Sequence, residues 1–133
     1  MPELFSSDWA QKYQQVWNSA GGIADELSKI GFNSVVAFGL DGEDQPRCVL
    51  TISDGQIVSA GPPKGEAINW DLRADQNEWE KLLAKPPGLM KLGLAYTSRK
   101  LKFKKGDYAA MIKDPSLSGA FVKCFALMSK AMG

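Results

Sequence analysis

Four short segments that favour β-strands follow one another in the first half of the chain, separated by turn residues. The segments are 34–40, 47–52, 56–60 and 68–73. Each is rich in β-branched, Leu or aromatic residues, or alternates apolar with polar positions, and each is too short for a buried helix. The Asp54-Gly55 pair between the second and third segments is a strong hairpin signal. We therefore expect an antiparallel meander of strands in this half.

Segments that favour helices surround these strands. The first, over 7–20, follows a serine that can cap it and places Trp9, Tyr13 and Trp17 on one face. Further helices are expected over 23–31, from Asp75 to a break at Pro86-Pro87-Gly88, over 89–94, from Gly106-Asp107 to Ile112, and from Asp114 to about Lys130. A strictly alternating run predicts a fifth strand over 100–104. Without a repeat or linker, residues 1–133 are expected to form a single α+β domain.

The composition is that of a globular protein, with 44% hydrophobic and 23% charged residues. No apolar run approaches the roughly 20 residues of a membrane-spanning helix, and the N-terminal residues lack the basic and apolar regions of a signal peptide. Cys48 and Cys124 lie in apolar segments, which favours two reduced core thiols over a disulfide. We therefore expect a cytoplasmic location.

Charge is divided unevenly along the chain. Residues 1–80 carry a net charge of −8, whereas residues 81–133 carry +9. Such asymmetry indicates a surface that meets anions, such as phospholipid headgroups or a phosphorylated carrier. The alternative is that the two halves interleave in space and neutralise each other. The sequence leaves both open.

The residue types that catalysis needs are scarce. The chain has no histidine, which removes the usual general base and the commonest metal ligand. Two isolated cysteines cannot form a structural zinc site, and the proline-containing loop 61–65 is not a phosphate-binding loop. The acidic turn 41–44 fits no calcium loop, and Asp107 is better interpreted as a helix cap than as a catalytic acid. We expect no enzymatic activity, metal or cofactor, and no nucleic-acid partner.

One run of residues carries a resemblance to a known family. The run is Arg99-Lys100-Leu101-Lys102-Phe103-Lys104-Lys105-Gly106-Asp107, with Ala109, Ala110 and Met111 after it. Together with the hairpin at Asp54-Gly55 and the Trp79-Glu80-Lys81-Leu82-Leu83 segment, it resembles the type-two sterol carrier protein, a lipid-binding domain. The resemblance covers about residues 8–130. It departs from the family at Arg99, where Gly is usual, and by one extra residue before Gly106.

The resemblance implies a curved, five-stranded, mostly antiparallel sheet that is covered on one face by helices, with an apolar tunnel between them. It implies non-catalytic binding and transfer of a fatty acid, fatty acyl group or phospholipid, with sterols and isoprenoids as further ligands. The segment 121–128 is apolar almost all round its helix, which fits a tunnel wall or a plain core. The expected tunnel residues are Trp70, Trp79, Leu83, Met90, Leu94, Phe103, Met111, Leu117, Phe121, Phe125 and Met128.

A basic strand is the expected contact with an anionic headgroup or a transient membrane surface. Its residues are Arg99, Lys100, Lys102, Lys104 and Lys105. Alternation sends Leu101 and Phe103 toward the core and the lysines away from it. The alternative is a solvated sheet face on which lysines discourage edge-to-edge pairing.

Two functions of other classes stay open. In one, the chain is an accessory or dimerisation domain whose apolar C-terminal helix docks on a lipid-metabolising enzyme or on a second copy in a weak homodimer. In the other, it is a small enzyme that acts on an acyl or isoprenoid group.

Overall fold

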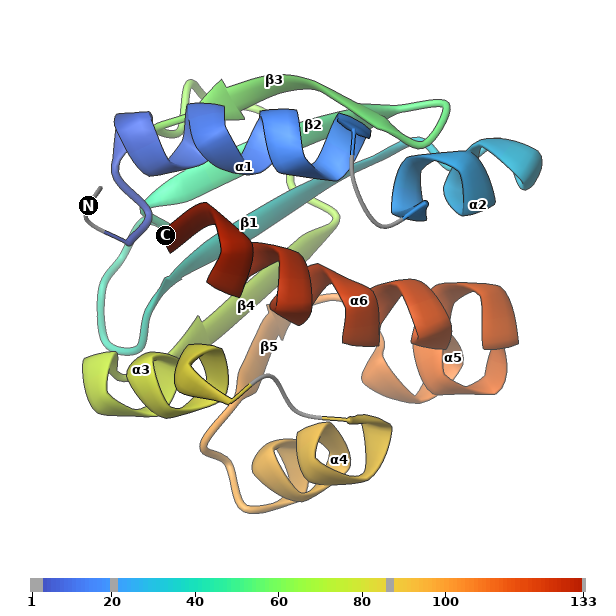
Figure 1. Ribbon diagram of the computed structural model, residues 1–133. Coiled ribbons are helices and arrows are strands. Elements are labelled where there is room, and N and C mark those ends of the chain that lie inside the picture. Colours follow the sequence, from blue (N-terminus) through green and yellow to red (C-terminus); the bar gives the residue numbers. More distant parts are fainter. Residues whose placement is uncertain (1–3, 20–21, 86–87, 133) are drawn as a thin grey trace.

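The computed structural model describes residues 4–19, 22–85 and 88–132 (Figure 1). Its elements are α1 (Ser7–Ser19), α2 (Ile23–Lys29), β1 (Ser34–Leu40), β2 (Cys48–Ser53), β3 (Gln56–Gly61), β4 (Trp70–Ala74), α3 (Gln76–Ala84), α4 (Leu89–Thr97), β5 (Lys102–Lys105), α5 (Tyr108–Lys113) and α6 (Pro115–Met132). The α+β class and the order of elements expected from the sequence are confirmed. The expected helix end at residue 20 and the break at Pro86-Pro87 lie outside the described residues.

The five strands form one open sheet in the order β3-β2-β1-β4-β5. Three neighbouring pairs are antiparallel, but β4 runs parallel to β1, in a register that pairs Val36 with Trp70 and Leu40 with Ala74. The expected antiparallel meander is therefore wrong at its fourth strand. The strand β4 does not pair with β3. The chain passes β2 and β1, and β4 pairs with the edge of β1 that faces away from β2.

Side chains of helix α1 bond to the edge of β3 that faces away from β2, so this edge is not open to a further strand. The side-chain amides of Gln14 and Asn18 both donate to the Ile57 carbonyl, at 3.0 and 2.9 Å, and the Asn18 carbonyl oxygen accepts from the Ile57 amide. Gln11 donates to the Ala60 carbonyl at 2.9 Å. These bonds satisfy backbone groups that an edge strand otherwise leaves open to another strand.

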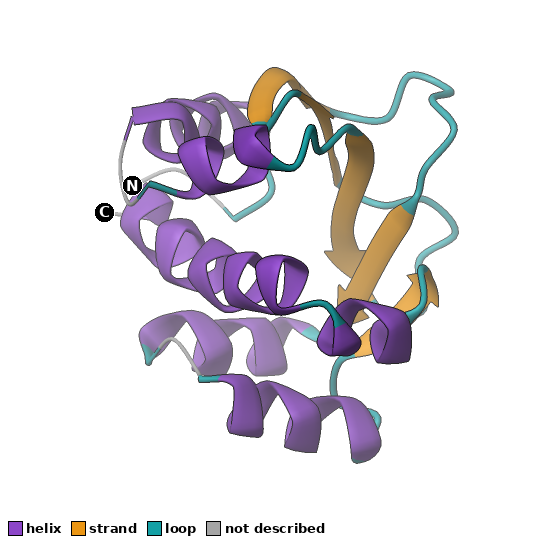
Figure 2. Ribbon diagram, turned by 90° about the vertical axis from the view of Figure 1, so that its right-hand side faces the viewer, coloured by secondary structure: helices purple, strands orange, loops and turns teal. Residues whose placement is uncertain are grey.

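The helices gather on one face of the sheet (Figure 2). Helix α6 crosses this layer and packs on α1, α2, α3 and α5. The hydroxyl of Tyr13 on α1 donates to the carbonyl of Cys124 on α6 at 3.1 Å, inside the core. Large aromatic rings fill the space between α1, α3, α6 and the sheet, with Trp79 against both Phe38 and Phe125. The expected helical cover on one face is confirmed.

The face of β4 that points away from the helices carries a buried ion pair. Asp71 and Arg73 are two residues apart, and both are only 3% exposed. The Arg73 guanidinium donates to both carboxylate oxygens of Asp71, at 2.6 and 3.1 Å. It also donates to the carbonyls of Leu40 and Glu43, at 3.1 and 2.6 Å. The pair therefore ties β4 to the turn that follows β1.

Candidate functional site

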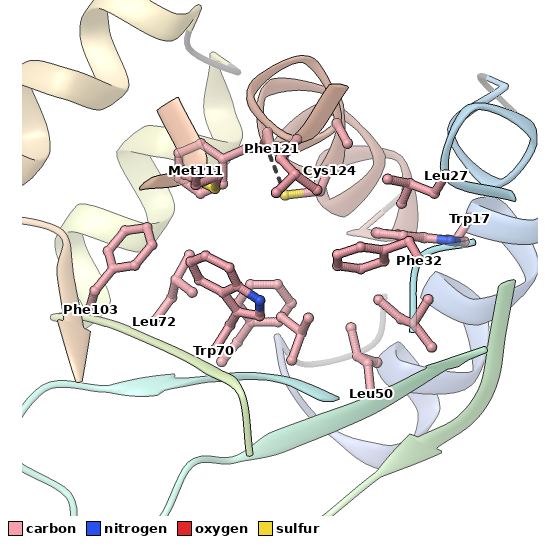
Figure 3. Close-up of a pocket in the computed structure, with 15 residues that line it drawn as sticks. Trp17, Leu27, Phe32, Leu50, Trp70, Leu72, Phe103, Met111, Phe121 and Cys124 are labelled. Carbon is pink, nitrogen blue, oxygen red and sulfur yellow. Dashed lines mark hydrogen bonds between the residues drawn. The ribbon is translucent and has the colours of Figure 1, made fainter. Parts of the chain in front are cut away.

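An apolar pocket lies between the helical layer and the sheet (Figure 3). Its volume is about 70 Å³. The lining residues are Trp17, Leu27, Phe32, Val36, Phe38, Leu50, Ile52, Trp70, Leu72, Phe103, Met111, Leu117, Ala120, Phe121 and Cys124. Only Trp17, Trp70, Met111 and Cys124 carry a nitrogen or sulfur atom in the side chain, so the pocket offers a ligand an apolar surface and few hydrogen-bonding groups.

The sheet wall of the pocket follows from strand alternation. Every second residue of a strand faces the helices, and four strands therefore contribute. Val36 and Phe38 come from β1, Leu50 and Ile52 from β2, Trp70 and Leu72 from β4, and Phe103 from β5. Because backbone hydrogen bonds join these strands, this wall is held as one unit.

The helical wall comes mostly from α6, with Met111 added by α5. Its α6 residues, Leu117, Ala120, Phe121 and Cys124, follow the three-and-four spacing of one helix face. Figure 3 shows Met111, Phe121 and Cys124 opposite Trp70 and Leu72. The far end is closed by Trp17 from α1, Leu27 from α2, and Phe32.

The Gly106-Asp107 pair positions one corner of the pocket. Gly106 has φ +102° and lies so close to the Trp70 ring that a Cβ atom there would overlap it. Only glycine tolerates both conditions. Asp107 caps α5, since its carboxylate accepts from the Ala110 amide at 3.2 Å. The interpretation of Asp107 as a helix cap is confirmed.

Two polar groups of the pocket, on Trp17 and Cys124, are neutral and hydrogen-bonded. The Trp17 indole donates to the Gly55 carbonyl at 2.8 Å, and the Cys124 thiol donates to the Phe121 carbonyl at 3.0 Å. Burial raises the pKa of the Cys124 thiol to about 12, so it stays protonated and unreactive at neutral pH. The described residues hold no cluster of three potential metal ligands. An arrangement of this kind would hold a ligand mainly through dispersion and the hydrophobic effect.

The structure divides the expected tunnel residues into three groups. Trp70, Phe103, Met111, Leu117 and Phe121 line the pocket. Trp79, Leu83, Phe125 and Met128 are buried in the core but do not line it. Met90 and Leu94 are 82% and 63% exposed on α4, so the structure does not place them at the pocket. A tunnel through the domain stays a prediction.

Sequence reasoning missed the lining residues that precede Trp70 in the chain. Val36, Phe38, Leu50 and Ile52 alternate within expected strands, so their inward direction was readable from the sequence. No local pattern distinguishes Leu27 as a pocket residue, because its place depends on how α2 packs against α6.

The basic strand is partly neutralised by the acidic turn 41–44. Lys102 pairs with Asp41 at 2.7 Å, which lowers the pKa of that carboxyl, and Lys104 donates to the Asp44 carbonyl at 3.2 Å. Lys123 also pairs across the two halves, with Glu26 at 2.6 Å. The oppositely charged halves therefore interleave in part. Arg99, Lys100 and Lys105 are exposed and make no ion pair with the residues that the structure describes.

The position of Phe125 allows a direct test of pocket against core. Its ring is fully buried, stacks on Trp79 at 6.1 Å and meets Phe121 edge-on at 5.3 Å. We expect Phe125→Trp to lower the free energy of unfolding by about 1–3 kcal/mol, because close-packed core resists added volume. Urea denaturation measures this change. Unchanged stability with weakened acyl binding would instead place Phe125 beside a ligand.

No known protein-family profile matches the chain, and no curated protein matches it in sequence. Solved structures do match. Sterol carrier protein 2 is 22% identical, with a TM-score of 0.75, over 96% of this chain and 98% of that one. A Thermus thermophilus protein described as a candidate sterol carrier protein is 23% identical, with a TM-score of 0.66, over 95% and 90% of the two chains. A ubiquinone synthesis protein, UbiJ-SCP2, is 14% identical, with a TM-score of 0.61, over 96% and 95%.

Proposed function

We propose that this protein, which has the fold of sterol carrier protein 2, is a non-catalytic lipid carrier. It binds the hydrocarbon chain of the lipid. The shared fold confirms the resemblance indicated by the run 99–107. The observation that carries the proposal is the apolar pocket between sheet and helices, whose ionisable group, the Cys124 thiol, stays neutral.

The pocket must widen to hold a lipid chain. Its volume of about 70 Å³ is well below the roughly 300–1,000 Å³ of small-molecule sites. The sheet wall is joined by backbone hydrogen bonds, whereas α5 is a six-residue helix that precedes α6 directly. We therefore expect α5 and the first turns of α6 to move outward when a ligand enters.

Burial of the hydrocarbon sets the affinity. Each buried methylene contributes about 0.8 kcal/mol, so a sixteen-carbon chain offers roughly 12 kcal/mol before costs. Association and ordering offset at least about 4 kcal/mol of this, which leaves micromolar binding near −8 kcal/mol at best. Because the pocket supplies no charged group, chain length should govern affinity and headgroup choice should be loose. A range of fatty acyl, phospholipid and isoprenoid ligands fits this chemistry.

Filling the pocket tests the proposal. Ala120 lines the pocket on α6, whereas Ala126 on the same helix is exposed. We expect Ala120→Phe to weaken binding of a fluorescent fatty acid at least about tenfold, which is a loss of 1.4 kcal/mol, because the new ring occupies the ligand's space. Ala126→Phe is the matched control and should bind as the unaltered chain does.

Two results would count against the pocket. One is an unaltered chain that gives no saturable signal with the fluorescent fatty acid and yields no lipid in an organic extract. The other is equal binding by the Ala120→Phe and Ala126→Phe variants. Melting temperatures of both variants should accompany the titration, so that loss of fold is not mistaken for loss of binding.

An accessory role beside a lipid-metabolising enzyme is the second candidate. It is supported by the structural similarity to a ubiquinone synthesis protein. The C-terminal helix is poorly suited to be its docking surface, because Phe125, Leu127 and Met128 are buried within this chain. Sedimentation equilibrium tests the homodimer form of this role, which predicts a mass that rises with concentration.

A further inference from the structure

We propose that helix α4 is the element through which this protein contacts an anionic membrane surface. Leu89, Met90 and Leu94 are 40%, 82% and 63% exposed, and all three lie on this one nine-residue helix. Among the described residues, three other large apolar or aromatic side chains have comparable exposure. Tyr96, at 37%, lies on α4 itself, whereas Ile30 and Val58 belong to separate parts of the chain. Single exposed apolar residues are ordinary, but a group on one helix marks an interaction site.

The helix is apolar on the side that the protein leaves uncovered. Leu92 and Ala95 are buried, and they mark the face that packs on the domain. At 100° per residue, Met90 and Leu94 fall on the opposite face, one turn apart. A helix that is apolar on both sides is normally covered on both sides. Figure 1 shows α4 at one end of the domain, below α3 and α6, with its far side open.

The surrounding charge favours an anionic bilayer over a protein partner. Residues 81–106 contain no acidic side chain. Lys85, Lys91, Arg99 and Lys100 are exposed in and around α4, and none of them forms an ion pair with another described residue. An apolar surface with basic residues at its border is the composition that interfacial helices use, with apolar side chains among acyl chains and cations at headgroups.

The same helix also borders the pocket. The Tyr96 ring on α4 stacks on Tyr108 at 4.0 Å and meets Phe103 edge-on at 5.6 Å. Phe103 in turn lines the pocket. Through Tyr96, helix α4 is therefore in contact with the wall of the proposed lipid site. The surface does not depend on the lipid-carrying function, since its test uses vesicles and not a ligand in the pocket.

Site-specific labelling tests the contact directly. The natural thiols of Cys48 and Cys124 are buried, so an environment-sensitive fluorophore on Met90→Cys should react at that position. We expect its emission to shift to shorter wavelength with vesicles of phosphatidylcholine and phosphatidylserine, but not with phosphatidylcholine alone. Val58→Cys on β3 is the matched control, because Val58 is 57% exposed on another element. Its label should not shift.

Vesicle co-sedimentation supplies the second measurement. The variant Met90→Gln with Leu94→Gln should weaken binding to phosphatidylserine vesicles at least about tenfold, since two apolar side chains no longer enter the bilayer. Val58→Gln should bind normally. Binding should also fade between roughly 0.1 and 1 M salt, as the Debye length falls from about 10 to 3 Å.

Three outcomes would overturn the proposal. They are an unshifted label at position 90 with phosphatidylserine vesicles, normal vesicle binding by the double Gln variant, and a concentration-dependent dimer that this variant abolishes. The last would assign α4 to a second copy of the chain. In each case, binding of a fluorescent fatty acid in solution is measured separately, so the pocket and the surface stand or fall independently.

Discussion

Replacement of Arg73 by Met is expected to lower the free energy of unfolding by about 3–5 kcal/mol, because it leaves a buried carboxylate without its partner. Asp71 is 3% exposed, and both its carboxylate oxygens accept from Arg73. The change also removes the donor to the carbonyls of Leu40 and Glu43. Urea denaturation measures the loss as a lower midpoint concentration of urea, when the dependence of the unfolding free energy on urea (the m-value) is the same for both proteins.

Two further variants distinguish the loss of a buried ion pair from the loss of any ion pair. Lys123→Met breaks an ion pair whose side chains are 42% and 50% exposed, and it should cost about 1 kcal/mol or less. The double variant Asp71→Leu with Arg73→Met should recover part of the lost stability, because no unpaired charge is left buried. Equal losses for Arg73→Met and Lys123→Met would contradict the assignment of a buried, tightly bonded pair.

The second large effect concerns the turn between β2 and β3. Asp54 and Gly55 have φ of 51° and 83°, as a two-residue hairpin turn of this kind requires. A Cβ atom on Gly55 would lie 2.5 Å from both the Ala24 carbonyl oxygen and the Ser28 amide nitrogen, which are backbone atoms of α2. We expect Gly55→Ala to cost about 2–5 kcal/mol, since backbone strain adds to the displacement of α2.

Gly42→Ala is the matched control for Gly55→Ala. Gly42 also has a positive φ, of 89°, but no atom lies within 4 Å of the position of its Cβ. Only the conformational cost applies there, which is about 1 kcal/mol. Thermal or urea unfolding of both variants gives the comparison. Similar losses of unfolding free energy in the two variants would show that the close approach of Gly55 to α2 adds nothing to the cost of the substitution.

Local signals predicted which segments form helices and strands, and the structure shows why they did not predict the sheet order. The hairpin at Asp54-Gly55 and the inward face of α1 depend on neighbouring residues, so they were readable from the sequence. Alternation along β4 is the same whether its neighbour is parallel or antiparallel. In the structure, the edge of β3 is bonded instead by Gln14 and Asn18, whose side chains contact Ile57. In the sequence, these are ordinary polar residues of an amphipathic helix.

The pocket was harder to predict than the fold because apolar periodicity does not separate a cavity wall from a packed core. Phe121 and Phe125 are one turn apart on α6, yet Phe121 lines the pocket while Phe125 stacks on Trp79. Whether a ring lines the pocket or belongs to the packed core depends on which residues of the other elements face it. Hydrophobicity likewise suggested an interior position for Met90, whereas α4 lies at the periphery and leaves it exposed.

The parallel pairing of β1 with β4 has a consequence for the way the chain folds. The strands β3 and β4 follow each other in sequence, but β2 and β1 lie between them in the sheet. The sheet therefore cannot assemble by adding one hairpin after another. The side-chain bonds from α1 to β3 and its turn join residues 38 to 49 positions apart, whereas the bond between Tyr13 and Cys124 joins residues 111 positions apart. Such distant contacts slow folding, because a long loop must close before they form. As the chain emerges from the ribosome, the part of the sheet's apolar inner face that α6 covers stays open until α6 has been made.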